Sequence, residues 1–448
     1  MQSLPEEAGI EHRHLVAPTV STRLNRNPLS TFDYYGQSPV ANLESERMAS
    51  TRSDDRSPWA VFLIFLHLGL TSFGGPIAHL GYFRDEFVTR RGWLTERSYA
   101  DLVVLCQFLP GPASSQVGMA LGLSRAGYSG ALAAWAGFTL PSAIVLVLFA
   151  LGISSYGDAV SPGALHGLKV VAVAVVAQAV WGMARNLCTD VLRVTIMAIA
   201  ACFVLLVPAA WGQVGVIAAA GIAGLLLFKP AQTVEHDPLP ITVSHRAGVV
   251  WLSLFFALLV GLPVLAQLLP NQTVAIVDAF FRAGSLVFGG GHVVLPLLQA
   301  EVVPSGWVSN EVFLAGYGAA QAVPGPLFTF AAFLGASMST APSSWIGGLI
   351  ALVAIFVPSF LLVVGALPFW EQLRRNVRTQ AALAGVNAAV VGLLLAALYQ
   401  PVWTSAIHQP QDFGLALVAL VALMFWKLPP WLVVVGSGAA GWLLSVVL

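Results

Sequence analysis

The chain has 448 residues, of which 57% are hydrophobic and 9% are charged, and its formal net charge is zero. Soluble domains usually carry about 25% charged residues, so this composition excludes an ordinary soluble domain and predicts an all-α polytopic membrane protein within a lipid bilayer. A net charge of zero also argues against a strongly basic surface, so no nucleic-acid partner is expected.

The first 57 residues differ in composition from the rest of the chain. They are polar and lack an apolar core of the signal-peptide type. We predict that residues 1–57 form a disordered cytoplasmic tail, in which Met48 is an alternative start to Met1. The tail contains Arg13, Arg23, Arg26, Arg47, Arg52 and Arg56.

Apolar segments of about 20 residues, the length needed to cross a bilayer as a helix, recur from Trp59 to the last residue. We divide them into a first repeat (58–228), a linker with one connecting span (229–275) and a second repeat (276–448). Examples are Ala131–Leu151, Gly167–Ala184, Val249–Leu269 and Gly348–Trp370.

The division follows from internal similarity. GWLTERSYADLVVLCQFLPGP (Gly92–Pro112) aligns without a gap on GWVSNEVFLAGYGAAQAVPGP (Gly306–Pro326), with six of 21 positions identical. Upstream, SFGGPIAHLGYFRDEF matches VFGGGHVVLPLLQAEV, and downstream FTLPS matches IFVPS. The upstream identities include Phe73/Phe288, Gly74/Gly289, Gly75/Gly290 and Glu86/Glu301.

Loop charges indicate that the two repeats have opposite orientations in the membrane. Loop 84–97 holds four arginines, whereas the equivalent loop 299–311 has no Lys or Arg. The asymmetry is reversed farther on, because loop 154–166 has no Lys or Arg while its counterpart carries Arg374, Arg375 and Arg378. Since positive loops stay in the cytoplasm, the sequence predicts an inverted repeat.

Four apolar segments contain a stretch that interrupts a helix: 59–83, 99–124, 276–298 and 313–338. A Phe-Gly-Gly or Pro-Gly-Pro stretch frees backbone polar groups, which is tolerated at membrane depth only where protein or a wet cavity satisfies them. We therefore predict broken, re-entrant helices that enter and leave on one face. The alternatives are full spans, thirteen in all, and ordinary proline-kinked helices.

Broken helices at matching positions of two inverted repeats point to a transport site. Helix N-termini attract anions, hydroxyls and amides can hydrogen-bond an anion, and glycines let it approach the backbone. Within the four segments the only carboxylates are Asp101 and Asp278. These features favour a tetrahedral oxyanion over a cation. The candidate substrate-binding residues are Gly74, Gly75, His79, Arg84, Gln107, Gly111, Ser114, Ser115, Arg282, Gly289, Gly290, Gly291, His292, Gln321 and Gly325.

Alternatives remain for two kinds of candidate. Each histidine could be a hydrogen-bonded packing residue. Arg282 could extend its side chain to the membrane interface. Its nearest carboxylate in sequence, Asp278, lies four residues earlier on the same helix face. Arg282 is therefore expected either to bind the dianion directly or to exchange between Asp278 and the substrate.

Enzyme, cofactor and metal motifs are absent from the sequence. GSGAAG (Gly436–Gly441) resembles a nucleotide fingerprint, but only seven residues follow it, and it is predicted to pack helices together. Cys106, Cys188 and Cys202 have no CxxC spacing and are predicted to be packing residues. We expect neither catalysis nor a bound cofactor.

Four stretches together resemble the paired signatures of the long-chain chromate ion transporters: SFGGPIAHLGYFRDEFV, ADLVVLCQFLPGPASSQVG, FRAGSLVFGGGHVVLPLL and GYGAAQAVPGPLFTFAAFLGA. The resemblance runs from about residue 58 to the C-terminus. It implies a protein of the bacterial inner membrane that exports chromate and confers resistance, with sulfate as a competing isostere. The protein could also form a homodimer.

Two other functions are compatible with parts of the sequence. One keeps the fold and makes the protein a sulfate-type oxyanion importer or an anion channel. The other is an intramembrane enzyme, which would need a paired-carboxylate or metal-ligand cluster inside a span, and the sequence has none.

Overall fold

The computed structural model describes residues 55–156, 161–207, 210–228, 243–288 and 290–447, and the regular elements among them are all helices, with no strand. Five helices are long and apolar enough to cross a membrane, which confirms the predicted all-α polytopic class. Most of the predicted tail, part of the linker and Gly289 lie outside the described residues, as do the side chains of Arg374 and Arg375. The five long helices are Ala113–Ser155, Pro162–Leu187, His245–Leu268, Ser344–Phe369 and Val377–Ala406.

In the first repeat, glycine and proline end the helices where the sequence predicts breaks. Phe73-Gly74 separates α2 from α3, and Pro110-Gly111-Pro112 separates α4 from α5. Within α5, two helices meet at the non-helical step Ala126-Gly127, where Gly127 has a φ of 62°. The elements are α2 (Pro58–Thr71), α3 (Gly75–Arg84), the π-helical η1 (Asp85–Arg90), α4 (Glu96–Phe108), α5 (Ala113–Tyr156), α6 (Pro162–Leu187), α7 (Val191–Leu206) and α8 (Ala210–Leu227).

After the connecting helix α9 (His245–Leu268), the second repeat follows the same order of breaks and helices. Equivalent hydroxyls start equivalent helices: Thr95 Oγ1 accepts the N–H of Ser98 in α4, and Ser309 Oγ accepts that of Val312 in α12. The elements are α10 (Gln272–Ser285), η2 (Gly291–Val293), α11 (Val294–Val302), α12 (Asn310–Ala320), η3 (Leu327–Thr329), α13 (Phe330–Ala336), α14 (Ser344–Ala366), η4 (Leu367–Phe369), α15 (Trp370–Arg375), α16 (Val377–Ala397), η5 (Leu398–Trp403), α17 (Thr404–Ala406), α18 (Pro410–Met424) and α19 (Pro430–Val447).

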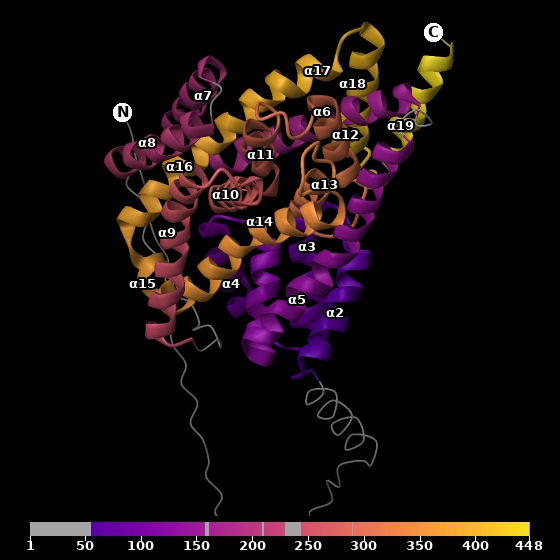
Figure 1. Cartoon of the computed structure of the whole chain (residues 1–448). Coiled ribbons are helices and arrows are strands. Elements are labelled where there is room, and N and C mark those ends of the chain that lie inside the picture. Colours follow the sequence, from indigo (N-terminus) through magenta and orange to yellow (C-terminus); the bar gives the residue numbers. More distant parts are fainter. Residues whose placement is uncertain (1–54, 157–160, 208–209, 229–242, 289, 448) are drawn as a thin grey trace, which may run out of the picture. The chain divides into compact units, whose positions relative to one another are not determined.

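The repeats exchange their last two helices. Helices α7 and α8 pack on α16 of the second repeat, whereas α18 and α19 pack on α6 of the first (Figure 1). Small residues allow both crossings: Gly163 and Gly167 of α6 meet Gly441 of α19, and Gly385 of α16 meets Gly224 of α8. The prediction that GSGAAG packs helices is confirmed. Each repeat therefore supplies part of the other's core.

The orientation of the repeats can be tested at Arg97 and Glu311, which are equivalent and exposed positions just inside α4 and α12. In a background without native cysteines, Glu311→Cys is expected to react with an impermeant thiol reagent applied to intact cells. Arg97→Cys is expected to react only after the membrane is permeabilised, because loop 84–97 is positively charged and stays inside.

Substitution at these positions leaves the capping residues Thr95 and Ser309 in place, so both helices keep their first turn. Equal labelling of the two cysteines would contradict the inverted orientation. The reverse pattern would favour thirteen full spans.

Candidate functional site

One backbone hydrogen bond links each Pro-Gly-Pro turn to the residue that precedes the Phe-Gly-Gly break of the opposite repeat. The N–H of Gly111 donates to the carbonyl of Val287 at 2.7 Å, and the N–H of Gly325 donates to the carbonyl of Ser72 at 2.9 Å. Gly111 is equivalent to Gly325, and Ser72 is equivalent to Val287, so the two bonds are related by the internal repeat. They satisfy backbone groups that the breaks would otherwise leave unpaired.

Glycine is required at both turns. Gly111 has a φ of 123° and Gly325 a φ of 97°, conformations that residues with a Cβ rarely adopt. A Cβ at Gly111 would lie 2.5 Å from Ser359 Oγ, and one at Gly325 would lie 2.9 Å from Ser142 Oγ. Ser142 and Ser359 are the equivalent serines of FTLPS and IFVPS. Each turn therefore packs against the Pro-Ser step of the other repeat.

The Phe-Gly-Gly breaks also approach each other. Gly74, Gly75 and Gly290 have positive φ values of 99°, 76° and 155°. A Cβ on Gly291 would lie 3.4 Å from Pro76 of the first repeat and 4.0 Å from Leu327, which follows the second Pro-Gly-Pro. The breaks of both repeats thus meet in one region.

Buried polar atoms without a partner surround these breaks. Gln116 shows the pattern: its Nε2 donates to the carbonyl of Pro110 at 2.7 Å, whereas its Oε1 accepts no hydrogen bond from the described residues. Buried polar atoms are normally paired, so a group of unpaired ones needs an explanation such as water or a polar ligand. In the part of the chain that the structure describes, the unpaired atoms near the breaks are Ser72 Oγ, His79 Nε2, Ser115 Oγ, Gln116 Oε1, Thr139 Oγ1, Gln321 Nε2 and Ser359 Oγ.

The two predicted histidines lie in different surroundings. His79 is buried, with Nδ1 3.4 Å from Ser114 Oγ and its ring edge-on to Phe138. His292 Nδ1 lies 2.8 Å from the hydroxyl of Tyr317. His79 therefore belongs to the group of unpaired polar atoms through Nε2, and His292 is held by a tyrosine.

The predicted glutamines also differ, although they occupy identical repeat positions. Gln107 is exposed on α4, whereas Gln321 ends α12 and buries an unpaired Nε2. The turn that follows Gln107 is instead held by Gln116. The repeat predicted the position of a glutamine but not its environment.

Arg84 is not brought to the breaks. It ends α3, nine residues after Gly75, or about 13.5 Å along the helix at 1.5 Å per residue. Its Nε and Nη2 donate to Glu96 at 2.9 and 2.7 Å, and its side chain is 53% exposed. Its guanidinium is thus engaged by Glu96.

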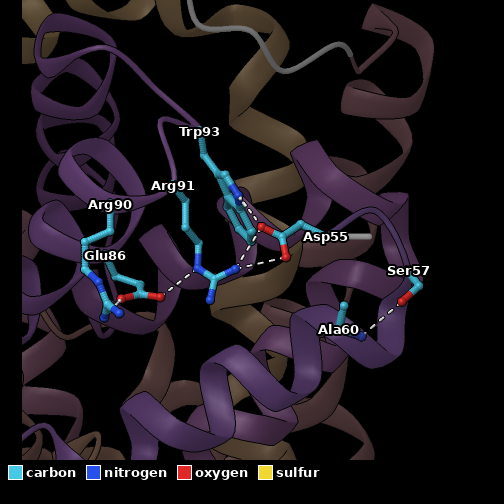
Figure 2. A network of polar contacts seen from close by, with 7 residues as sticks. All are labelled: Asp55, Ser57, Ala60, Glu86, Arg90, Arg91 and Trp93. Atoms are coloured by element: carbon cyan, nitrogen blue, oxygen red, sulfur yellow. Dashed lines mark hydrogen bonds and ion pairs between the residues drawn. The ribbon is translucent and has the colours of Figure 1, made fainter. Parts of the chain in front are cut away.

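The loop after Arg84 is fixed by its own polar network (Figure 2). Arg91 Nε donates to Glu86 at 2.6 Å, and its Nη1 donates to both oxygens of Asp55 at 2.8 and 2.9 Å. Trp93 Nε1 also donates to Asp55, at 3.2 Å. Burial lowers the pKa of Arg91, but Glu86 and Asp55 outweigh it and raise the pKa above its usual value. Asp55, within the predicted tail, anchors the chain to this loop.

Arg282 forms a separate, buried ion cluster. It is 8% exposed, and its Nη2 lies 2.7 Å from Asp278, the partner expected from the sequence. Its Nη1 and Nη2 also contact Glu301 of α11, and its guanidinium lies 4.9 Å from the ring centre of Trp211. Neighbouring helices enclose the guanidinium, which favours the ion cluster over an extension of the side chain to the membrane interface.

Sequence reasoning missed several of these residues. The sequence could have indicated Glu301, because Glu301 is identical to its counterpart in the first repeat. The sequence could also have indicated Ser142 and Ser359, because each follows the proline that is repeated in FTLPS and IFVPS. No sequence signal marks Gln116 as a support of the turn, or places Trp211 beside Arg282, since both depend on how helices meet.

Comparison with known proteins gives a consistent family assignment. A family model described as "Chromate transporter" matches residues 59–225 and 274–442. The chain is 28% identical to a "Probable chromate transport protein" of Synechococcus elongatus, covering 84% of this chain and 93% of that protein. It is 29% identical to a "Chromate transport protein" of Pseudomonas aeruginosa, covering 90% and 98%.

A shorter relative, "Uncharacterized transporter YwrA" of Bacillus subtilis, is 31% identical over 36% of this chain and 89% of its own length. No solved structure matches the chain. A relative that aligns almost fully with little more than one third of this chain fits the two-repeat organisation.

The requirement for glycine at the two Pro-Gly-Pro turns can be tested by measuring the thermal stability of glycine-to-alanine variants. Gly111→Ala and Gly325→Ala are each expected to destabilise the protein by at least about 1–2 kcal/mol, because the new Cβ must adopt a left-handed backbone conformation beside a buried serine. The measurement is the Tm of the purified protein in detergent.

Gly152→Ala provides the matched control, since nothing lies within 4 Å of a Cβ at that helical position. It is expected to leave the Tm unchanged or to raise it slightly. Wild-type stability of both turn variants would contradict the requirement for glycine.

Proposed function

Because this chain belongs to the chromate transporter family, we propose that it exports chromate from the cytoplasm across a bacterial inner membrane and thereby confers chromate resistance. One observation supports the proposal above all: the helix breaks of the two repeats contact each other, and buried polar atoms near them have no partner among the described residues. Irregular backbone at membrane depth is tolerated where it lines a pathway, and broken helices in inverted repeats are typical of transporter binding sites.

Within that region we propose a path for the anion beside the two turns. Hydroxyl and N–H groups from both repeats supply hydrogen-bond donors, among them Ser72, Ser115 and Ser359, and α5 begins just after Pro112 with its free N–H groups. Donors without a full positive charge hold an anion loosely enough for it to leave again, as transport requires. A Cβ on Gly75 would meet nothing within 4 Å, so this glycine leaves room beside the backbone.

The membrane potential suffices to drive export. Moving one charge is worth about 2.3 kcal/mol per 100 mV, so a dianion gains about 4.6 kcal/mol per 100 mV on leaving an inside-negative cell. At about 1.36 kcal/mol per tenfold change, this supports roughly three decades of concentration difference. No ATP is needed in this scheme.

The direction and substrate are tested with inverted membrane vesicles. A lumen-positive potential is expected to accelerate uptake of labelled chromate, and collapse of the potential is expected to slow it. Labelled sulfate is measured in parallel and is expected to enter much more slowly. Equal uptake of both anions would favour a general oxyanion channel, and no chromate uptake would contradict the proposal.

We also propose that Arg282 either binds the dianion directly or exchanges between Asp278 and the substrate during transport. Arg282→Gln is expected to abolish chromate transport, and Arg282→Lys to retain part of it, because lysine keeps the charge but loses the planar fork. The measurement is chromate uptake normalised to the amount of protein in the membrane.

Removal of Arg282 alone leaves Asp278 and Glu301 buried without a counter-charge, a penalty on the order of 3–5 kcal/mol. Arg282→Gln is therefore also combined with Asp278→Asn and Glu301→Gln, which removes those charges. Wild-type uptake by the single or the triple variant would exclude Arg282 from anion handling.

A further inference from the structure

An arginine joins the two limbs of the first Phe-Gly-Gly hairpin by bridging two carboxylates. One limb is α2, and the other is α3 with its continuation η1. Arg91 Nε donates to Glu86 of η1 at 2.6 Å, and its Nη1 donates to Asp55, just before α2, at 2.8 and 2.9 Å (Figure 2). We call these three side chains the first clamp.

A second clamp joins α10 and α11, the limbs of the other Phe-Gly-Gly hairpin. Arg282 Nη2 donates to Asp278 of α10 at 2.7 Å, and its Nη1 and Nη2 donate to Glu301 of α11. Glu301 is the repeat equivalent of Glu86, but the two arginines are not equivalent, because Arg91 follows its hairpin and Arg282 lies within the first limb. The same connection is therefore made to the same glutamate position by different arginines.

A tryptophan supports each clamp. Trp93 Nε1 donates to Asp55 at 3.2 Å in the first clamp. In the second, the guanidinium of Arg282 lies 4.9 Å from the ring centre of Trp211 on α8, and Gln213 of the same helix lines a small cavity beside it. Because α8 belongs to the first repeat, the second clamp is held partly by the opposite repeat.

The limbs of each hairpin pack mainly on other helices and not on each other. Helix α2 packs on α5, and α10 packs on α14 and α9. A limb can therefore move away from its partner limb and keep its main packing surface. Charge-assisted hydrogen bonds such as those of the clamps are strong, so they hold together limbs that share little other contact.

Loop charges assign the two clamps to opposite faces of the membrane. Glu86 and Arg91 lie in the arginine-rich loop 84–97, which is expected in the cytoplasm. Glu301 lies one residue before the end of α11, where the region 299–311 without Lys or Arg begins, and this region is expected outside. Transport by alternating access requires a closure on each face, and the two must not open together.

We propose that the two clamps are the gates of the anion path, with Glu86 as the gate residue on the cytoplasmic face and Glu301 as the gate residue on the outer face. Separation of Glu86 from Arg91 frees the limbs of the first hairpin and opens the path to the cytoplasm. Separation of Glu301 from Arg282 opens it to the outside. Both glutamates are positioning residues that act through the arginines. The inference rests on the proposed function, because the gates act on the path proposed there.

The gates are tested by the side of the membrane from which the path can be reached. Ser115→Cys, in the full chain without native cysteines, places a thiol in the proposed path. Its rate of reaction with an impermeant thiol reagent is measured in intact cells and in inverted vesicles. Adding Glu301→Gln is expected to raise the rate in intact cells by about tenfold or more, the population shift that follows loss of a charge-assisted hydrogen bond, and to lower the rate in inverted vesicles. Adding Glu86→Gln is expected to do the reverse.

The glutamine variants are expected to fold, because each arginine keeps its other carboxylate and no buried charge is left without a counter-charge. A second pair of variants cuts the other arm of each clamp. Asp278→Asn is expected to shift the labelling in the same direction as Glu301→Gln, and Asp55→Asn in the same direction as Glu86→Gln. A merely structural role would not give opposite shifts on the two sides of the membrane.

Glu96→Gln is the matched control. Glu96 also binds an arginine, Arg84, beside loop 84–97, but this pair joins α3 to α4 and not the two limbs of a hairpin. Its removal is expected to leave both labelling rates at the values of the Ser115→Cys protein. Unchanged labelling in the clamp variants, or the same shift on both sides, would overturn the inference. Labelling needs no chromate, so the absence of chromate transport would overturn the proposed function and would leave the gates to be decided by labelling alone.

Discussion

The structure depends on the reciprocal hydrogen bonds between the Pro-Gly-Pro turn of one repeat and the carbonyl that precedes the Phe-Gly-Gly break of the other. A broken helix in an apolar setting exposes backbone groups that lipid cannot satisfy. Gly111 and Gly325 each bring an N–H to a carbonyl of the opposite repeat. The breaks are thus stable only in pairs, and the pairing brings the ends of the half-helices together.

Whole helices also depend on the opposite repeat for their packing. Helix α16 is covered by α7 and α8, and α6 by α18 and α19, so each repeat buries a helix of the other. Small residues at both crossings permit close approach, as in many membrane helix pairs. The two repeats therefore pack into one body through these crossings.

Charged side chains are few, and their positions are informative. Arg84, Arg90 and Arg91 pair with carboxylates near loop 84–97 and fix that loop. Arg282, by contrast, is buried with two carboxylates between helices, where ion pairs are costly to maintain. The region around the turns relies on hydroxyls, amides and backbone N–H groups, which bind an anion less tightly than a guanidinium does.

The sequence alone determined the helical class, the two repeats, the position of each break and the pairing of Arg282 with Asp278. These features depend on composition, on residues close in the chain, or on a repeated motif, all of which can be read without coordinates. Only the tertiary structure decided that Gln116 and not Gln107 supports the first turn, that Arg84 binds Glu96, and that Glu301, Gln213 and Trp211 gather around Arg282. Those contacts join segments that are far apart or on different helices. The rotation of each helix about its axis, set by packing, determines which side chains meet.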